Sequence, residues 1–438
     1  MSLMSHAVQH YRKLPAPTTR SIRTERDLPV PMRDGTRLLA DRWAPRRGPE
    51  GLPTALVRTP YEHRGLHDRT IARPLAERGF QVISVAMRAG AGGAADPLRK
   101  EYEDGLDVIA WIIAQPWFGG SLVPAGPNHL GGAQWAVAAD APPQVKAMVP
   151  AAASMAADVL PDFSVPASLV GGWYDAFLPG QVRDFAALQA AGRHPRLTIG
   201  PWAHDDTARA AVAETLDFAL PLALGRIPAE RAAVRLYVMG EEAWRDFDSW
   251  PPQGYKEKRV LLGADGSLSV KHREGTVGFR YDPDDPTPTL GGHGIDRAGK
   301  ADNIWLEARP DVLTFTTDVL TRDFEVVGHV NAAIRFRSTR PTANVFVRLC
   351  DVDPLGRSWN VCDGLTRVTE ATEAQTVPVD LWPTAYRFAT GHRIRVQVSS
   401  GDVPDRHGRG ADLDAADQEV HCGGDHPSTI TLPIRPAA

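Results

Sequence analysis

The feature that most constrains this chain of 438 residues is a glycine-framed turn between an apolar segment and a run of small residues. Residues 126–131 read GPNHLG, after the apolar residues 122–125 and before residues 132–139 (GAQWAVAA). Glycine permits the sharp turn that joins a strand to a helix and lifts the central residue above the edge of a sheet. In the motif G-x-S-x-G that residue is a serine nucleophile. Here it is Asn128, a poor nucleophile because its nitrogen lone pair is delocalised, so we expect no acyl-serine chemistry at this position.

Two polar residues follow predicted strands downstream of this turn. Asp175 comes after a strand predicted at 166–171, and His204 comes after one predicted at 196–199, with a helix predicted at 180–190 between them. In an open parallel sheet, functional groups lie beyond the carboxyl ends of the strands. The chain order of nucleophile position, acid and histidine is that of a catalytic triad on such a sheet. A lone Asp or His is more often structural, but this order predicts that Asp175 and His204 form a catalytic pair.

Segments spread over nearly the whole chain resemble the cocaine-esterase and X-Pro dipeptidyl-peptidase (CocE/NonD) family of α/β-hydrolases. The matching segments are residues 30–38 (VPMRDGTRL), 58–61 (RTPY), 172–177 (GWYDAF), 200–204 (GPWAH), 238–240 (VMG), 244–245 (WR), 391–400 (GHRIRVQVSS) and 426–428 (HPS). The resemblance implies that Asp175 is the catalytic acid and His204 the catalytic histidine. It also implies an oxyanion-hole role for the hydroxyl of Tyr61.

The chain departs from the pattern of the family it resembles. Asn128 stands at the serine position, and His129 stands where a tyrosine usually follows. The family's Asp-x-Arg-Gly after the fourth strand is replaced by residues 86–89 (AMRA). Relatives insert a helical cap domain where this chain has only about residues 155–164. These departures favour divergence to a different task over a single engineered change, and the reduced cap predicts an open cleft for a bulky substrate.

The pattern of predicted secondary structure changes at about Pro228. In residues 1–227 predicted strands alternate with helices, which is typical of a doubly wound, mainly parallel α/β sheet. In residues 228–438 short β-rich runs are separated by Gly- and Pro-rich turns, which predicts an all-β sandwich. The family resemblance makes this sandwich a jelly roll with a structural role. The first part is predicted to have strands at 54–58 and 80–86 and helices at 69–78 and 103–115, and the second part strands at 234–239, 260–262, 313–317, 324–327, 332–338, 344–352 and 393–399.

Composition favours a soluble globular enzyme. Hydrophobic residues make up 43% and charged residues 23% of the chain, and a net charge of −4 gives no reason to expect nucleic acid or an anionic membrane as partner. No segment is apolar for long enough to be a signal peptide or a membrane span. Three scattered cysteines provide neither a disulfide framework nor a zinc site. We therefore expect a cytoplasmic protein that acts on a small molecule without a metal or other cofactor, and the oligomeric state stays open.

Two further motifs could carry other chemistry. His63 and His67 have the i,i+4 spacing of a metal pair on a helix, but Gly65 between them and the lack of a nearby third ligand favour a loop. Residues 90–93 (GAGG) follow a strand, yet they lack both G-x-G-x-x-G and the Walker lysine. Neither motif predicts a cofactor site.

Four side chains near the predicted pair have two interpretations each. Ser154 could replace the lost nucleophile, although a serine bonded to backbone fits its position better. Trp173 and Trp202 flank the pair and could bind substrate by stacking on a planar group, with packing as the default. Arg88 could bind an anionic group or form an internal ion pair.

Three functions remain. The first, which we predict, is an enzyme in which the Asp175–His204 pair moves a proton at the substrate. Tyr61 and the backbone N–H of His129 would stabilise an enolate or phenolate, and Asn128 and His129 would bind the substrate. Such chemistry leads to carbon–carbon bond formation, cyclisation, elimination or isomerisation, and the Ala-, Arg-, Gly- and Pro-rich composition is compatible with natural-product biosynthesis. The alternatives are an esterase- or peptidase-type hydrolase or acyltransferase, and a catalytically silent binding protein.

Overall fold

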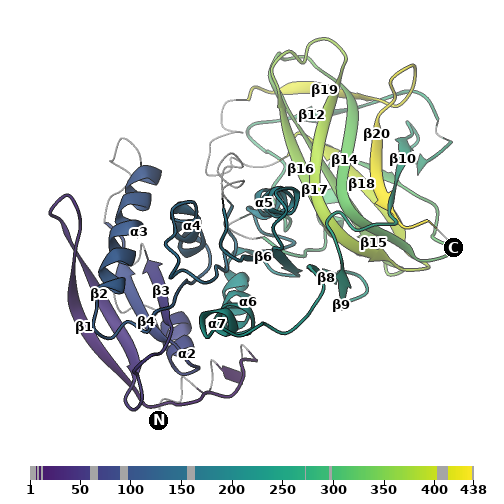
Figure 1. Ribbon diagram of the computed structural model, residues 1–438. Helices are drawn as coiled ribbons and strands as arrows, with labels where there is room; N and C mark the ends of the chain where they lie inside the picture. The colour runs from purple at the N-terminus through teal and green to yellow at the C-terminus, as the bar shows by residue number, and fades with distance from the viewer. Residues whose placement is uncertain are drawn as a thin grey trace. The chain divides into compact units, whose positions relative to one another are not determined.

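The computed structural model describes most of the chain as two compact units (Figure 1). Unit 1 comprises Met1–Gly172 and Phe177–Arg235, and unit 2 comprises Trp173–Ala176 and Leu236–Ala438. The described residues are 6, 9–10, 13–59, 68–88, 97–154, 163–271, 273–294, 298–401 and 413–436.

Unit 1 is built on a mainly parallel sheet, as the sequence predicts. Its first five strands have the order β1-β2-β4-β3-β5. β2 runs antiparallel to β1 and β4, whereas β3 pairs in parallel with β4 and β5. Every residue of β3 is buried, including Arg58, so its sequence (TALVRT) does not alternate between apolar and polar residues. The bounds are Ile22–Pro31 for β1, Arg37–Pro45 for β2, Thr54–Thr59 for β3, Gln81–Ala86 for β4 and Leu122–Pro124 for β5.

Residues 145–151 continue this sheet beyond β5. Parallel bridges join them to β5 on one side and to β6 (Ser168–Gly172) on the other. β6 then pairs in parallel with β7 (Arg196–Gly200), with Gly172 opposite Gly200. The carboxyl ends of β5, β6 and β7 therefore lie at the same edge of the sheet, and each is followed by one of the predicted site residues.

Helices pack on both faces of the sheet of unit 1. On β3, Leu56 and Arg58 line a cavity with residues of α3 (Pro97–Ile113) and α4 (His129–Ala136), which lie side by side in Figure 1. The alternate residue Ala55 belongs to the core that contains α2 and α6. The other helical segments are η1 (Asp68–Ala72), α2 (Arg73–Ala76), α5 (Leu178–Ala190), η4 (His204–Asp206), α6 (Thr207–Glu214), η5 (Thr215–Ala219) and α7 (Leu220–Ala223).

The helix predicted at 103–115 is wrong at its start, because α3 begins at Pro97. Proline is well suited to the first turn of a helix, where its missing N–H has no intrahelical partner. The predicted helix left out the charged residues that follow Pro97. They form the first turns of α3 and include Glu101, whose side chain reaches the interior.

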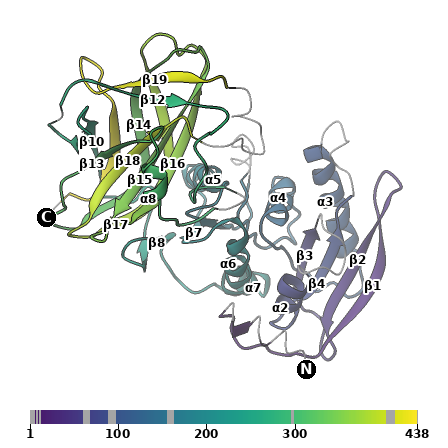
Figure 2. The same ribbon diagram turned by 180° about the vertical axis from the view of Figure 1, so that it is seen from behind.

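Unit 2 is a β-sandwich of two sheets, which confirms the predicted C-terminal jelly-roll architecture (Figure 2). The larger sheet has the order β11-β10-β20-β14-β19-β12, with β17 also paired to β14, and the smaller has the order β13-β18-β15-β16. The bounds are β8 Val234–Val238, β9 Ala243–Phe247, β10 Lys256–Leu262, β11 Leu268–Ser269, β12 Thr276–Tyr281, α8 Ile304–Glu307, β13 Leu313–Thr316, β14 Phe324–Ser338, β15 Ala343–Val352, β16 Ser358–Val368, β17 Gln375–Phe388, β18 Arg393–Ser399, β19 Ala416–His421 and β20 Thr429–Ile434.

The two strands predicted at 324–327 and 332–338 are one long strand, β14, and their separation was wrong. The pairing of β14 with β20 shifts register between Val326 and Asn331, where β14 has more residues than the strand opposite it. A register shift of this kind inserts an extra residue and bends a strand without ending it. The irregular residues at the bulge interrupt the strand pattern of the sequence, which is why two strands were predicted there.

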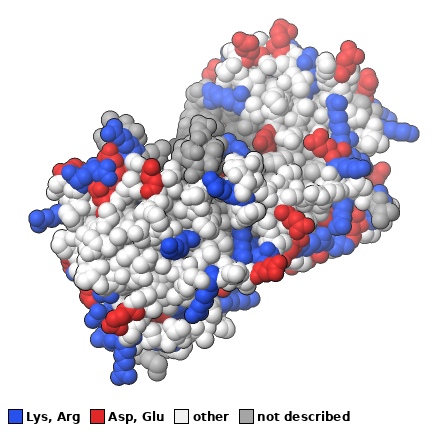
Figure 3. Space-filling model, viewed as in Figure 1, with Lys and Arg blue, Asp and Glu red and all other residues white. Residues whose placement is uncertain are grey.

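The surface of the described residues carries mixed charge. On the face drawn in Figure 3, basic and acidic side chains are interspersed, and neither sign forms a continuous field there. A polyanion-binding protein is expected to concentrate Lys and Arg on one face. In the described part of the chain, no helix combines the length and the hydropathy needed to span a bilayer.

Candidate active site

The turn after β5 holds Asn128 in a backbone conformation that few residues adopt. Asn128 has φ 57° and ψ −126° and directly precedes α4. Non-glycine residues at positive φ are uncommon, and a residue held in such a sparsely populated region costs roughly 1–3 kcal/mol. This strand–turn–helix geometry is the one that presents the central residue of a nucleophile elbow above the sheet. The structure therefore contains the elbow, with a carboxamide at its apex.

Two glycines make this turn possible. Gly126 has φ +121°, and a Cβ atom there would lie 2.3 Å from Cδ2 of Leu130. A Cβ on Gly131 would lie 2.8 Å from the carbonyl oxygen of Ala151. The close approach of α4 to residues 145–151 therefore occurs at Gly131. The second glycine of the motif G-x-S-x-G would be residue 130, which is a leucine here.

Gln134, which was not predicted as a site residue, hydrogen-bonds to the main chain of the turn and of residues 145–151. Its Nε2 donates to the carbonyl oxygens of Gly126 at 2.8 Å and Val149 at 3.2 Å, and its Oε1 accepts from the N–H of Val149 at 3.0 Å. The residue is 1% exposed. One signal could have found it: a single amide side chain in the small and apolar run at 132–139.

His204 follows β7 and is buried in unit 1. It is 8% exposed and begins the short helix η4. Its carbonyl oxygen accepts a hydrogen bond from Oγ1 of Thr207 at 2.8 Å, and its ring centroid lies 5.5 Å from that of Phe177. The main chain and one face of the imidazole are therefore held in place from two elements.

Asp175 and Trp173 lie in the short segment that belongs to unit 2. Asp175 is fully buried, and its backbone forms a parallel bridge with Gly294. A buried carboxylate is retained only with partners, because its desolvation is costly. Trp173 is 1% exposed, donates from Nε1 to the carbonyl oxygen of Tyr237 at 2.7 Å and lies 6.4 Å from the ring of Trp250. These contacts account for a packing role of Trp173.

Trp202 packs over the ends of two neighbouring strands. A Cβ atom on Gly172 would lie 2.2 Å from the carbonyl oxygen of Trp202, and one on Gly200 would lie 2.6 Å from its ring. Glycine at both strand ends therefore makes room for the Trp202 turn. Asp175 and His204 follow these same two ends, so the loop geometry on which both depend is set by the strand-end glycines.

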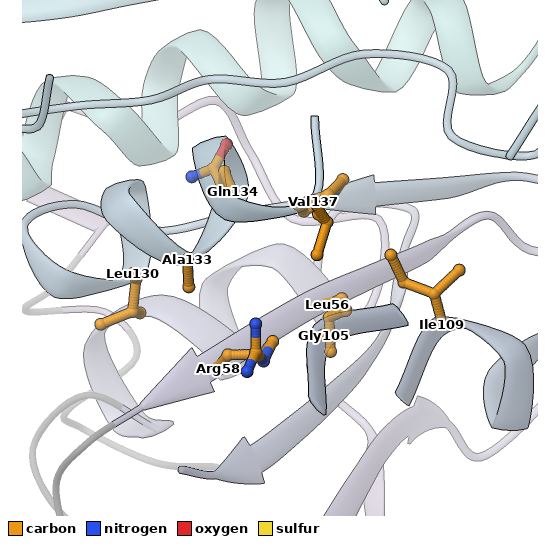
Figure 4. Close-up of a pocket in the computed structure, with 9 residues that line it drawn as sticks. Leu56, Arg58, Gly105, Ile109, Leu130, Ala133, Gln134 and Val137 are labelled. Carbon is orange, nitrogen blue, oxygen red and sulfur yellow. The ribbon is translucent and has the colours of Figure 1, made fainter. Parts of the chain in front are cut away.

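Arg58, which is buried, forms an ion pair with the partly buried Glu101 on α3. Nη2 of Arg58 donates to Oε2 of Glu101 at 2.9 Å. Burial lowers the pKa of Arg58, and burial raises the pKa of Glu101 against the opposing positive charge of Arg58. Figure 4 shows Arg58 and Gln134 among the residues that line a cavity of about 10 Å³, roughly the volume that one water needs. His129 itself is exposed at the start of α4.

Ser154 and Arg88 are placed by structural contacts. Ser154 packs against the start of α5, where a Cβ atom on Gly180 would lie 2.2 Å from its Oγ. Arg88 bonds to Asp104 at 2.6 Å and 2.9 Å and to Asp34 at 3.0 Å. These bonds show the internal ion pair, and they leave the anion-binding interpretation of Arg88 without support.

Several predicted features lie outside the described residues. They include Tyr61, His63, His67 and most of the segment at 155–164. Among the residues that the structure does describe, no group of three or more His, Cys, Asp or Glu side chains is arranged to hold a metal ion. The sequence predicts that Asn128, Asp175 and His204 each follow a strand, and in the structure they follow β5, β6 and β7.

Models of two protein families match the chain. The X-Pro dipeptidyl-peptidase (S15 family) model matches residues 34–162. The model of the X-Pro dipeptidyl-peptidase C-terminal non-catalytic domain matches residues 229–431. The first match contains the elbow, and the second falls on the β-sandwich.

Known proteins resemble the chain over nearly its full length. Cocaine esterase of Rhodococcus sp. (strain MB1 Bresler) is 27% identical in an alignment that covers 92% of this chain and 97% of the esterase. That alignment is 562 positions long, so the esterase contains segments that this chain of 438 residues lacks.

Solved structures share the fold. An aminopeptidase from a marine sediment Thaumarchaeota archaeon has a TM-score of 0.81 at 17% identity, covering 96% of this chain and 97% of that one. A CocE/NonD family hydrolase from Staphylococcus aureus has a TM-score of 0.73 at 15% identity, covering 96% and 99%. The chain therefore combines an X-Pro dipeptidyl-peptidase (S15 family) domain with the C-terminal domain of those peptidases, and it is similar to cocaine esterase over 92% of its length and to CocE/NonD family hydrolases in its fold.

Proposed function

We propose that this chain is an enzyme that hydrolyses an ester or amide bond of a small molecule without forming an acyl-enzyme on residue 128. The observation that carries the proposal is the backbone of Asn128, held at φ 57° and ψ −126°. Strained conformations persist where the surrounding structure over-determines them, and they cluster at active sites. The hydrolase family supports the reaction class, and the carboxamide at the apex argues against a covalent intermediate there.

In this proposal His204 is the general base. It takes a proton from a water molecule as the water oxygen forms a bond to the substrate carbonyl carbon. It then gives that proton to the leaving alcohol or amine as the scissile bond breaks. Asp175, buried beyond the end of β6, fixes the tautomer of His204 and stabilises its protonated form. Such proton transfer contributes roughly 10²–10⁴-fold to the rate.

The start of α4 supplies groups for the developing oxyanion. The N–H of His129 is at the first helical position, where the helix itself provides no partner and the macrodipole favours negative charge. We propose that this N–H and the Tyr61 hydroxyl stabilise the oxyanion. In the described part of the chain, Oδ1 of Asn128 is buried without a hydrogen-bond partner. It is therefore available to accept a hydrogen bond from the substrate or the attacking water.

A second candidate uses the same base without hydrolysis. Here His204 removes a proton beside a carbonyl, and the enolate or phenolate goes on to carbon–carbon bond formation, cyclisation, elimination or isomerisation of a bulky substrate. The observation that favours it is Asn128 itself, because such chemistry needs no nucleophile at the apex. The relatives favour hydrolysis, which is why this candidate stands second.

The test combines a substrate panel with a serine probe. The wild-type protein is assayed on aryl esters and on aminoacyl-prolyl anilides, before and after incubation with a fluorophosphonate. We expect turnover that the fluorophosphonate does not block and that His204→Ala removes. Fluorophosphonate labelling of the wild type, for example at Ser154, would contradict the proposal by revealing a serine nucleophile. Loss of substrate α-deuterium without hydrolysis would select the second candidate, and binding without any reaction would identify a silent binding protein.

A further inference from the structure

We infer that Gln134 is the positioning residue that fixes the direction in which the elbow presents residue 128. Its carboxamide bonds to the main chain at two places that are far apart in sequence. One is Gly126, two residues before Asn128, and the other is Val149, two residues before Ala151. The N–H of Asn128 donates to the carbonyl oxygen of Ala151 at 2.9 Å. Gln134 therefore sets the register between the turn and residues 145–151, on which the orientation of Asn128 depends.

The three bonds require an amide side chain. Two main-chain carbonyls accept from Nε2, and one main-chain N–H donates to Oε1, so the position needs donors and an acceptor on one short planar group. Glutamate is of the same size but cannot donate when ionised, and methionine offers neither function. Since Gln134 is 1% exposed, water does not replace the lost bonds without entering the core.

The inference deepens the proposed function, because it concerns the same elbow. Its test reads the orientation of residue 128 directly and needs no native activity. In Asn128→Cys the introduced thiol stands at the N-terminus of α4, where helix N–H groups lower the pKa of a correctly aimed thiol. The rate of alkylation by iodoacetamide, measured as a function of pH, reports that pKa. A chain without catalytic activity would still pass or fail this test.

The matched control is Gln181, a second buried glutamine of unit 1. Its Nε2 donates to the carbonyl oxygen of Val170 on β6 at 2.9 Å, so its bond is to the strand beyond residues 145–151 and not to the turn at 126–131. In the Asn128→Cys background we expect Gln134→Met to raise the apparent thiol pKa and to slow alkylation at neutral pH by about tenfold, the loss that one pKa unit produces in the thiolate fraction. Gln181→Met, at a comparable loss of thermal stability, should change the rate by less than about twofold.

A second variant keeps the test decisive if Gln134→Met does not fold. Gln134→Glu preserves the volume and the acceptor for the N–H of Val149, but it has no donor when ionised and only one when protonated, so it cannot bond to the carbonyl oxygens of both Gly126 and Val149. We expect it to fold and to show the same slowed alkylation of the introduced thiol. Equal alkylation rates and thiol pKa values in the Gln134 variants and the Gln181 control would overturn the inference, since Gln134 would then only stabilise the core.

Discussion

The N–H of Asn128 bonds to the carbonyl oxygen of Ala151 at 2.9 Å, and each lies at or beside a non-glycine residue with positive φ. Asn128 has φ 57°, and Ala152, the residue after Ala151, has φ 47°. Backbone strain is therefore concentrated where the elbow meets residues 145–151. Such strain persists only where many contacts fix the local structure, and strained residues cluster at functional sites. The strain at this junction therefore supports a functional role for the elbow.

The elbow should accept a nucleophile. Asn128→Ser places a hydroxyl at the apex, in a turn whose backbone is already strained into the presenting geometry. We expect weak hydrolysis of an activated aryl ester and labelling by a fluorophosphonate, neither of which involves residue 128 in the wild type. The measurement is release of p-nitrophenol, with the labelled peptide identified by mass spectrometry.

The double variant Asn128→Ser with His204→Ala is the control for this gain. It should lose both the hydrolysis and the labelling, because the serine then has no base. An inert Asn128→Ser protein with unchanged thermal stability would contradict the assignment of residues 126–131 as a working elbow.

The proposed base should dominate turnover. His204→Ala is expected to lower turnover of an accepted substrate by roughly 10²-fold or more while substrate still binds. Asp175→Asn should also lower it, because an amide can favour the wrong imidazole tautomer. The double variant should lose much less than the sum of the two losses, since the residues act as one unit. Initial rates across pH check this, and full activity of His204→Ala would refute the mechanism.

Two adjacent glycines of α4 should respond in opposite ways to alanine. A Cβ atom on Gly131 would meet the carbonyl oxygen of Ala151 at 2.8 Å, so Gly131→Ala should lower the free energy of unfolding by about 1–3 kcal/mol. Nothing lies within 4 Å of a Cβ atom on Gly132, so Gly132→Ala should raise it by up to about 1 kcal/mol through helix propensity. Denaturant unfolding compares them. A stabilising Gly131→Ala would show that α4 can move away from residues 145–151.

The partly buried Glu101 should make the stability of the fold depend on pH. Burial raises the pKa of Glu101, although the positive charge of Arg58 opposes the shift. A carboxyl whose folded-state pKa exceeds its unfolded value contributes stability below the unfolded pKa and loses it as pH rises through the folded pKa. Near pH ~4 wild type and Glu101→Gln should be about equally stable, because both carry a neutral side chain, and by pH ~8 the wild type should be the less stable.

Unfolding free energies from pH ~4 to ~8 check this expectation. Glu103→Gln, a partly exposed position on the same helix, corrects for the change in net charge. A wild type that gains stability over Glu101→Gln with rising pH would show that the ion pair with Arg58 outweighs the cost of burial.

Strands whose apolar residues form a short run or alternate with polar ones could be predicted from the sequence. Residues 393–399 were predicted as a strand and form β18, and the strand predicted at 54–58 is β3. β16 (Ser358–Val368) was missed because buried polar residues interrupt its pattern. Asn360 bonds to the main chain at Gly299 and Ala301, and Asp363 pairs with Arg348 on the neighbouring strand. The partners that make these side chains compatible with burial are distant in sequence.

The candidate site also combines residues that local sequence patterns locate with residues whose role depends on distant partners. Its apex, Asn128, and the strand-end residues Asp175 and His204 were predicted because motif spacing and chain order locate them. Gln134 was not, because its importance lies in bonds to Val149, on a segment whose pairing no local pattern reveals. The raised pKa of Glu101 likewise depends on the fold that buries it.

The contacts that hold the elbow are made by main-chain atoms and by side chains other than that of residue 128. The N–H of Asn128, the glycines at 126 and 131, and the carboxamide of Gln134 define the turn. A change of the apex side chain therefore removes none of the contacts that define the turn. A lineage can exchange one reaction for another at this position by single-codon steps, without passing through unfolded intermediates, so chemistry can evolve faster here than architecture.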